Sequence, residues 1–99
     1  MIEIKAKKAH GLSKITGLIG KKSATPLLLT TRFGIHTFFL KFPIDVLVLD
    51  ESNSVVGFKE GLKPNRVFLW NPKYSTVVEL PQGSIKRLKV VLGSEIKLN

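Results

Sequence analysis

The sequence predicts one mainly β domain, a β-sandwich or barrel-like fold carrying one or two short helices. The chain has 99 residues, which is the usual size of a single domain. About seven or eight short apolar segments succeed one another with a turn roughly every 8–12 residues, a spacing typical of all-β domains. No long helical pattern separates these segments, which disfavours a parallel α/β sheet. Hydrophobic residues make up 43% of the chain, as in an ordinary globular protein.

The N-terminal half predicts four strands and one helix. Residues 2–7 alternate apolar and charged side chains, as in a half-buried strand. Residues 11–20 place apolar side chains at helical spacing. Three more strands are expected at residues 26–31, 36–41 and 44–50. Pro43 lies between the last two and marks a bend, and we expect any unusual backbone at the Phe42–Pro43 bond.

The C-terminal half predicts four further strands and a second short helix. A turn at residues 51–54 joins the strand before it to a hairpin partner at 55–59. The next strands are expected at 67–70 and 76–80, around a turn containing Pro72. Ser84 is expected to cap one helical turn that runs through Leu88. A last strand is expected at 95–98.

Composition limits the classes of function. Sixteen Lys and Arg oppose seven Asp and Glu, a formal net charge of +9, and most of the excess lies within residues 1–32. Such a bias attracts phosphate or acidic partners. The chain has no Cys and only two His, His10 and His36, so we expect no disulfide, metal site or cofactor. It shows no signal-peptide pattern and no membrane span, so we expect a cytoplasmic protein.

Several segments share their order and spacing with a known family. They are Thr16-Gly17-Leu18-Ile19-Gly20-Lys21, the run from Gly34 to Asp50, Val55-Val56, Leu62-Lys63-Pro64-Asn65-Arg66 and Val77-Val78-Glu79-Leu80-Pro81-Gln82-Gly83. Together they cover nearly the whole chain, which resembles the uncharacterised domain of unknown function 192 family. The resemblance implies a compact, mainly β domain and no particular activity. Leu40 stands where that family usually has Met, and Ser94 stands where it tends to have Asp.

Polar residues that interrupt apolar strands are the candidate site. In the predicted strand at 44–50, Asp45 shares a face with Leu47 and Leu49, so its carboxylate needs donors. These could be backbone N–H groups near Pro43, which is the structural interpretation, or arginine side chains. The functional interpretation is a ligand-binding cluster in which arginines hold an anionic group and His36 and Asp45 orient it. Its members are Arg32, His36, Asp45, Arg66 and Glu79.

The sequence therefore favours a non-enzymatic binding or accessory domain with an anionic small molecule or a protein as its partner. One alternative is a basic nucleic-acid-binding β-barrel with a patch at Lys7, Lys8, Lys14, Lys21 and Lys22. It is not favoured, because most Phe residues lie in apolar runs typical of a core, and nucleic-acid binders present exposed aromatics. A second alternative is a small hydrolase or isomerase that uses His36 with Asp45 or Glu79. The chain contains no phosphate-binding loop or nucleophilic serine motif.

Overall fold

The structure is a computed structural model that describes residues 1–8, 25–38 and 40–99. The helix predicted at 11–20 lies outside the described residues, as do His10, Lys14, Lys21 and Lys22. Among the residues that the structure does describe, no helix is long and apolar enough to cross a membrane.

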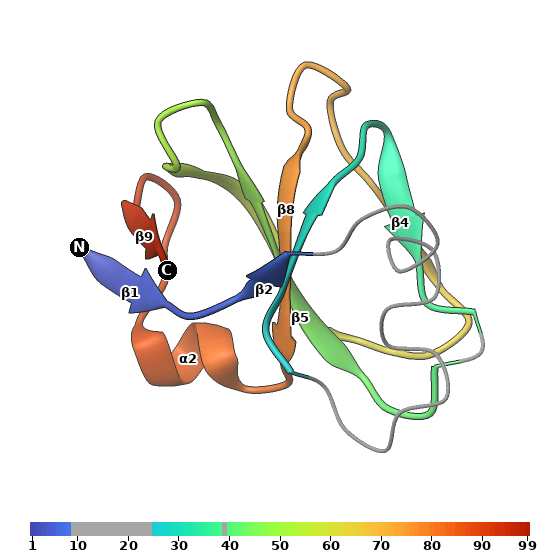
Figure 1. The fold of residues 1–99 in the computed structure, drawn as a ribbon. Helices are drawn as coiled ribbons and strands as arrows, with labels where there is room; N and C mark the ends of the chain where they lie inside the picture. Colours follow the sequence, from blue (N-terminus) through green and yellow to red (C-terminus); the bar gives the residue numbers. More distant parts are fainter. Residues whose placement is uncertain (9–24, 39) are drawn as a thin grey trace.

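A five-stranded sheet forms the centre of the molecule, in the order β2-β3-β8-β5-β6 (Figure 1). Its strands are β2 (Lys7–Lys8), β3 (Leu27–Thr30), β8 (Thr76–Pro81), β5 (Ile44–Leu49) and β6 (Val55–Leu62). The short β2 is parallel to β3, whereas every other neighbouring pair is antiparallel. All six residues of β5 are buried, because this strand has a neighbour on each side and a covered core on each face.

The two faces of the sheet bury separate cores, because successive side chains of a strand point to opposite faces. One core contains Leu47 and Leu49 of β5. It is covered by α2 (Ser84–Leu88) and by the parallel pair of β1 (Ile2–Ile4) and β9 (Ile96–Leu98). The other core contains Ile44 and Val46 of the same strand. The antiparallel pair of β4 (Gly34–His36) and β7 (Val67–Leu69) covers that second core and lies across the sheet from α2 (Figure 1).

The predicted fold class, a mainly β domain with short helices, is confirmed. Strands occur at nearly all the predicted places, and α2 has the predicted bounds. The sheets that the structure describes do not close into a barrel, because β2 and β6 form separate edges of the central sheet.

Three local predictions are wrong. The strand expected at 36–41 ends at His36, because the chain turns after it, and the Thr37 carbonyl accepts the N–H groups of Leu40 and Asn65 at 3.2 and 3.0 Å. Ser84 does not cap α2. Gly83 holds the N-cap position, and the Ser84 hydroxyl donates to the carbonyl of Pro81 at 2.6 Å. No peptide bond in the described residues is cis, so the Phe42–Pro43 bond is not the unusual one.

Candidate functional site

Asp45 is fully buried and its carboxylate is saturated with backbone donors. The N–H of Gly61 donates to Oδ1 at 2.9 Å, and those of Gly83 and Ile85 donate to Oδ2 at 3.1 and 2.9 Å. Backbone N–H groups were an expected partner, but the donors come from β6 and the start of α2 rather than from the bend at Pro43. These three bonds join α2 and the end of β6 to the centre of the sheet, which is a structural role.

Glu79 is also buried, but it faces the other core. It lies directly opposite Val46 and Leu27 on the neighbouring strands, and both of those residues belong to the core beneath β4 and β7. Burial of the side chain, which is 8% exposed, raises the pKa of its carboxyl to about 7. Because Asp45 faces the core beneath α2, the sheet separates the two carboxylates and they do not form the acid–base pair considered above.

The remaining three residues of the predicted cluster lie at the surface. His36 is exposed at the end of β4, where its ring stacks on Phe38 with centroids 5.0 Å apart. Its Nδ1 accepts a hydrogen bond from the Phe38 N–H at 3.3 Å. Arg66 is exposed next to Val67, the register partner of His36. Arg32 lines a pocket at the other end of β4. The five predicted residues therefore do not converge on one site.

The outward side of the β4–β7 pair carries an exposed apolar and aromatic surface, which we call the ribbon face. It consists of His36, Phe38, Val67 and Leu69, and the exposed Phe33 precedes Gly34 at its border. Val67 and Leu69 lie opposite His36 and Gly34, while Ile35 and Phe68 point inward to the core. Exposed fractions are 53% for Val67, 68% for Leu69 and 41% for Phe38. Single exposed apolar residues are common, but a contiguous group of them marks an interaction surface.

Phe33, next to Gly34 at the start of β4, has a rare backbone conformation. Its φ is +73°, and the N–H of Gly34 bonds the carbonyl of Arg32 across it at 2.9 Å, which makes a γ-turn of the strained type. The N–H of Trp70 fixes the Phe33 carbonyl at 2.9 Å. The turn leaves the Phe33 ring 65% exposed. Strain of this kind, retained where nothing buries the side chain, is a feature of binding sites.

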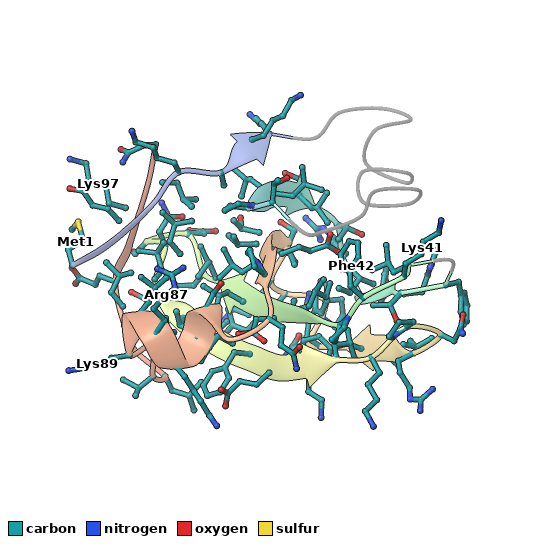
Figure 2. All side chains as sticks on the ribbon, turned by 90° about the horizontal axis from the view of Figure 1, so that it is seen from below. Met1, Lys41, Phe42, Arg87, Lys89 and Lys97 are labelled. Carbon is teal, nitrogen blue, oxygen red and sulfur yellow. The ribbon has the colours of Figure 1, made fainter. Side chains whose placement is uncertain are left out.

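The ribbon face is built from cationic segments of the chain. The segments that build it and its borders, residues 26–44 and 61–78, contain no Asp or Glu. They supply the exposed side chains of Arg32, Lys41, Lys63 and Arg66. The face therefore combines aromatic rings with positive charge. Lys41 lies at the opposite end of the molecule from Lys89 and Lys97 (Figure 2).

The sequence did not reveal this surface. Phe38 falls in an apolar run, which favours a core position, yet the strand ends before it and the ring stacks on the exposed His36. Val67 and Leu69 flank Phe68 in a run that reads as buried on both faces, whereas the two-stranded pair buries only one. Within the described parts of the chain, no group of three or more His, Asp and Glu could hold a metal ion.

Comparison with known proteins assigns the chain to a family. The family model described as DUF192, Uncharacterized ACR, matches residues 3–98. The chain belongs to the DUF192 family. A UPF0127 protein of Pyrococcus horikoshii is 33% identical over 92 residues, covering 87% of this chain and 79% of that protein. A UPF0127 protein of Pyrococcus abyssi is 38% identical over 69 residues, which cover 68% of this chain and only 58% of that relative's length.

Two solved structures share the fold of this DUF192 domain. A protein of unknown function from Novosphingobium aromaticivorans DSM 12444 has a TM-score of 0.80 and 14% identity, and the match covers 93% of this chain and 73% of that one. A protein from Sinorhizobium meliloti 1021, described as "a putative transcription regulator", has a TM-score of 0.78 and 19% identity, with 89% and 76% of the two chains covered. At these identities the likeness is one of fold.

Proposed function

We propose that this DUF192 protein is a non-enzymatic binding domain that holds single-stranded nucleic acid on its ribbon face. The observation that carries the proposal is the exposure of Phe33 and of the stacked His36–Phe38 pair in segments that carry exposed cations and contain no Asp or Glu. Proteins that bind single strands combine aromatic platforms, on which bases stack, with positive charge that follows the phosphates.

Duplex nucleic acid suits the face less well than a single strand. Stacking on Phe33 or Phe38 requires an unstacked base, which a single strand offers and a duplex does not. Val67 and Leu69, which lie opposite His36 and Gly34, add exposed apolar area, and Arg66 and Lys63 are exposed cations that could contact phosphates.

The placement of the buried acids weighs against the hydrolase or isomerase alternative. His36 is exposed on the outward side of the β4–β7 pair, Glu79 faces the core beneath that pair, and Asp45 faces the core beyond the sheet. A general acid and a general base must both lie within hydrogen-bond reach of one reacting group. His36, Asp45 and Glu79 face three different sides of the sheets, so no two of them meet this condition.

Binding of a fluorescently labelled twelve-nucleotide single strand, measured by anisotropy, tests the proposal. Phe38→Ala should weaken binding roughly 5–150-fold, because one stacked base contributes about 1–3 kcal/mol, and Phe38→Trp should restore it. Arg66→Ala should lower the slope of log K against log salt by about 1. The control is Lys86→Ala with Arg87→Ala on α2, at the far end of the molecule (Figure 2).

Two results would refute the proposal. One is no binding of any single strand at low salt. The other is equal loss of binding in the α2 control and the ribbon variants, which would mean a diffuse attraction of positive charge. Binding of an acidic polypeptide with the same dependence on Phe38 would instead assign the face to a protein partner.

A further inference from the structure

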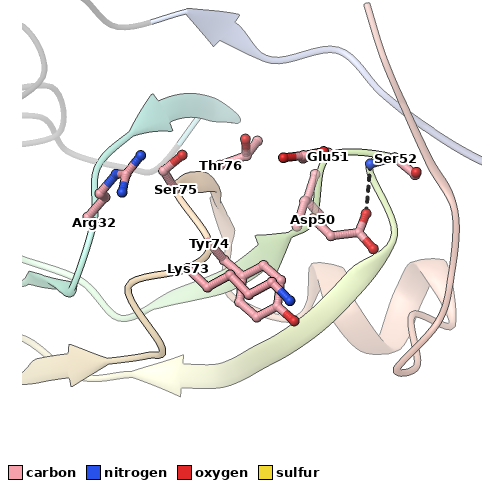
Figure 3. Close-up of a pocket in the computed structure, with 9 residues that line it drawn as sticks. Arg32, Asp50, Glu51, Ser52, Lys73, Tyr74, Ser75 and Thr76 are labelled. Carbon is pink, nitrogen blue, oxygen red and sulfur yellow. Dashed lines mark hydrogen bonds between the residues drawn. The ribbon is translucent and has the colours of Figure 1, made fainter.

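A polar pocket of about 400 Å³ opens next to the ribbon face. It lies between the β5–β6 turn and the loop that leads into β8, with Arg32 on its border (Figure 3). Its lining residues are Arg32, Leu49, Asp50, Glu51, Ser52, Lys73, Tyr74, Ser75 and Thr76. The volume falls in the range of small-ligand sites, although the lining is more polar than in most of them.

Arg32 and Glu51 are the charged groups that point into this space. Figure 3 shows the Arg32 guanidinium and the Glu51 carboxylate directed toward Ser75 and Thr76 from opposite sides. Asp50 has another task, because its Oδ1 accepts the N–H groups of Ser52 and Ser54, both at 2.9 Å, and so shapes the turn. The Lys73 ammonium lies 5.8 Å from the centre of the Tyr74 ring.

The pocket and the proposed binding surface adjoin each other at two consecutive residues, Arg32 and Phe33. Arg32 provides the carbonyl that closes the γ-turn at Phe33, so the pocket border and the exposed ring are consecutive residues. A strand that stacks a base on Phe33 would carry its neighbouring nucleotide toward Arg32. Arg32 favours an anionic group on the ligand, and the negative charge of Glu51 favours hydrogen-bond donors on another part of the same ligand.

We propose that this pocket holds one nucleotide of the strand, with its phosphate on Arg32 and its base edge on Glu51. This inference rests on the proposed function and adds a base preference to it. Guanine presents an N–H and an amino group side by side, which together match the two oxygens of a carboxylate. Uracil presents a single N–H between two carbonyl oxygens, which a carboxylate repels. The pocket therefore prefers guanine to uracil, with the hydroxyls of Ser75 and Thr76 available to the sugar.

Free mononucleotides test the pocket independently of the ribbon face. Guanosine monophosphate should shift the amide resonances of Ser52, Ser75 and Thr76 in titrations followed by NMR, and uridine monophosphate should need at least about 10-fold more ligand. Glu51→Gln should remove most of this preference, and Arg32→Gln should make the nucleotide bind no better than guanosine. The matched control is Glu60→Gln, an exposed carboxylate near the other end of the β5–β6 hairpin.

The outcomes separate the two proposals. Binding of oligonucleotides that depends on Phe38, together with no pocket shifts from either mononucleotide, would overturn the pocket assignment and leave the ribbon face standing. Shifts that are equal for guanine and uracil and unaffected by Glu51→Gln would overturn the base preference. Pocket shifts without any oligonucleotide binding would refute the ribbon proposal, and with it the assignment of the pocket to a strand.

Discussion

Asp45 and Glu79 occupy adjacent register positions on the paired strands β5 and β8, yet their carboxylates enter opposite cores. Asp45 lies opposite Leu80, and Glu79 lies opposite Val46. The first carboxylate receives three backbone N–H groups, whereas burial raises the pKa of the second to about 7. These two acids, at adjacent register positions, therefore affect the stability of the fold in different ways. Single substitutions of each can distinguish the two effects.

Replacing Asp45 by Asn should destabilise the fold strongly. The amide would keep one acceptor oxygen and turn an NH₂ group toward N–H donors from Gly61 or from Gly83 and Ile85, leaving buried donors unsatisfied. We expect a loss of about 2–4 kcal/mol in the free energy of unfolding, measured by urea denaturation. Glu60→Gln on the exposed part of β6 is the control. A variant within about 0.5 kcal/mol of the parent protein would contradict the structural role of Asp45.

Glu79 should make stability fall as pH rises. The pKa of its carboxyl is about 7 in the folded chain against an ordinary value of 4.5, so between these values the folded state retains a proton that the unfolded state has released. The free energy of unfolding should decline through this window by about 3 kcal/mol and stay level above pH 7.

Glu79→Gln should remove that decline. Parent and variant should have similar urea midpoints near pH 4, while the variant should be more stable at pH 8. The difference between the two proteins isolates this group from all others that titrate. Parallel pH curves for the two proteins would show that the Glu79 carboxyl is not held in its neutral form by burial.

Thr37 should stabilise the loop beside the ribbon face. Its hydroxyl donates to the carbonyl of Lys63 at 2.6 Å and accepts the N–H of Arg66 at 2.9 Å, and the side chain is fully buried. Thr37→Val keeps the shape but leaves both backbone groups unpaired, so we expect a loss of about 1–3 kcal/mol. Thr31→Val, which removes only a long contact of 3.5 Å to the Arg32 carbonyl, should change thermal stability far less. Equal effects of the two substitutions would argue against this role.

Gly34 should be intolerant of any side chain. A Cβ at this position would lie 2.5 Å from the Phe68 carbonyl oxygen and 2.6 Å from Cδ2 of Leu69, so β4 and β7 would have to separate. Gly34→Ala should destabilise by about 1–3 kcal/mol and weaken oligonucleotide binding. Gly57→Ala is the matched control, because its Cβ would meet only Val48 at 3.9 Å. Unchanged melting of Gly34→Ala would show that the pair adjusts freely.

The local sequence pattern predicted most of the strands and the helix α2, but it predicted few of the contacts between them. The alternation around β5 and the turn after it are visible in the sequence, and so is the need of Asp45 for donors. Its actual donors lie 16 to 40 residues further along the chain, and only the folded topology brings them there. The same limit explains Phe38, because the end of β4 depends on the bonds that the Thr37 carbonyl accepts from Leu40 and from the distant Asn65.

The pairing of β1 with β9 has a consequence for synthesis. Ile2 pairs with Ile96 and Ile4 with Leu98, and the two ends of the chain lie side by side (Figure 1). During translation β1 is made before the other strands of this domain, whereas β9 is made after them. Closing so long a loop is slow compared with hairpin formation. Residues 2–4 should therefore be the last backbone amides to gain protection from hydrogen exchange, after the central sheet has already formed.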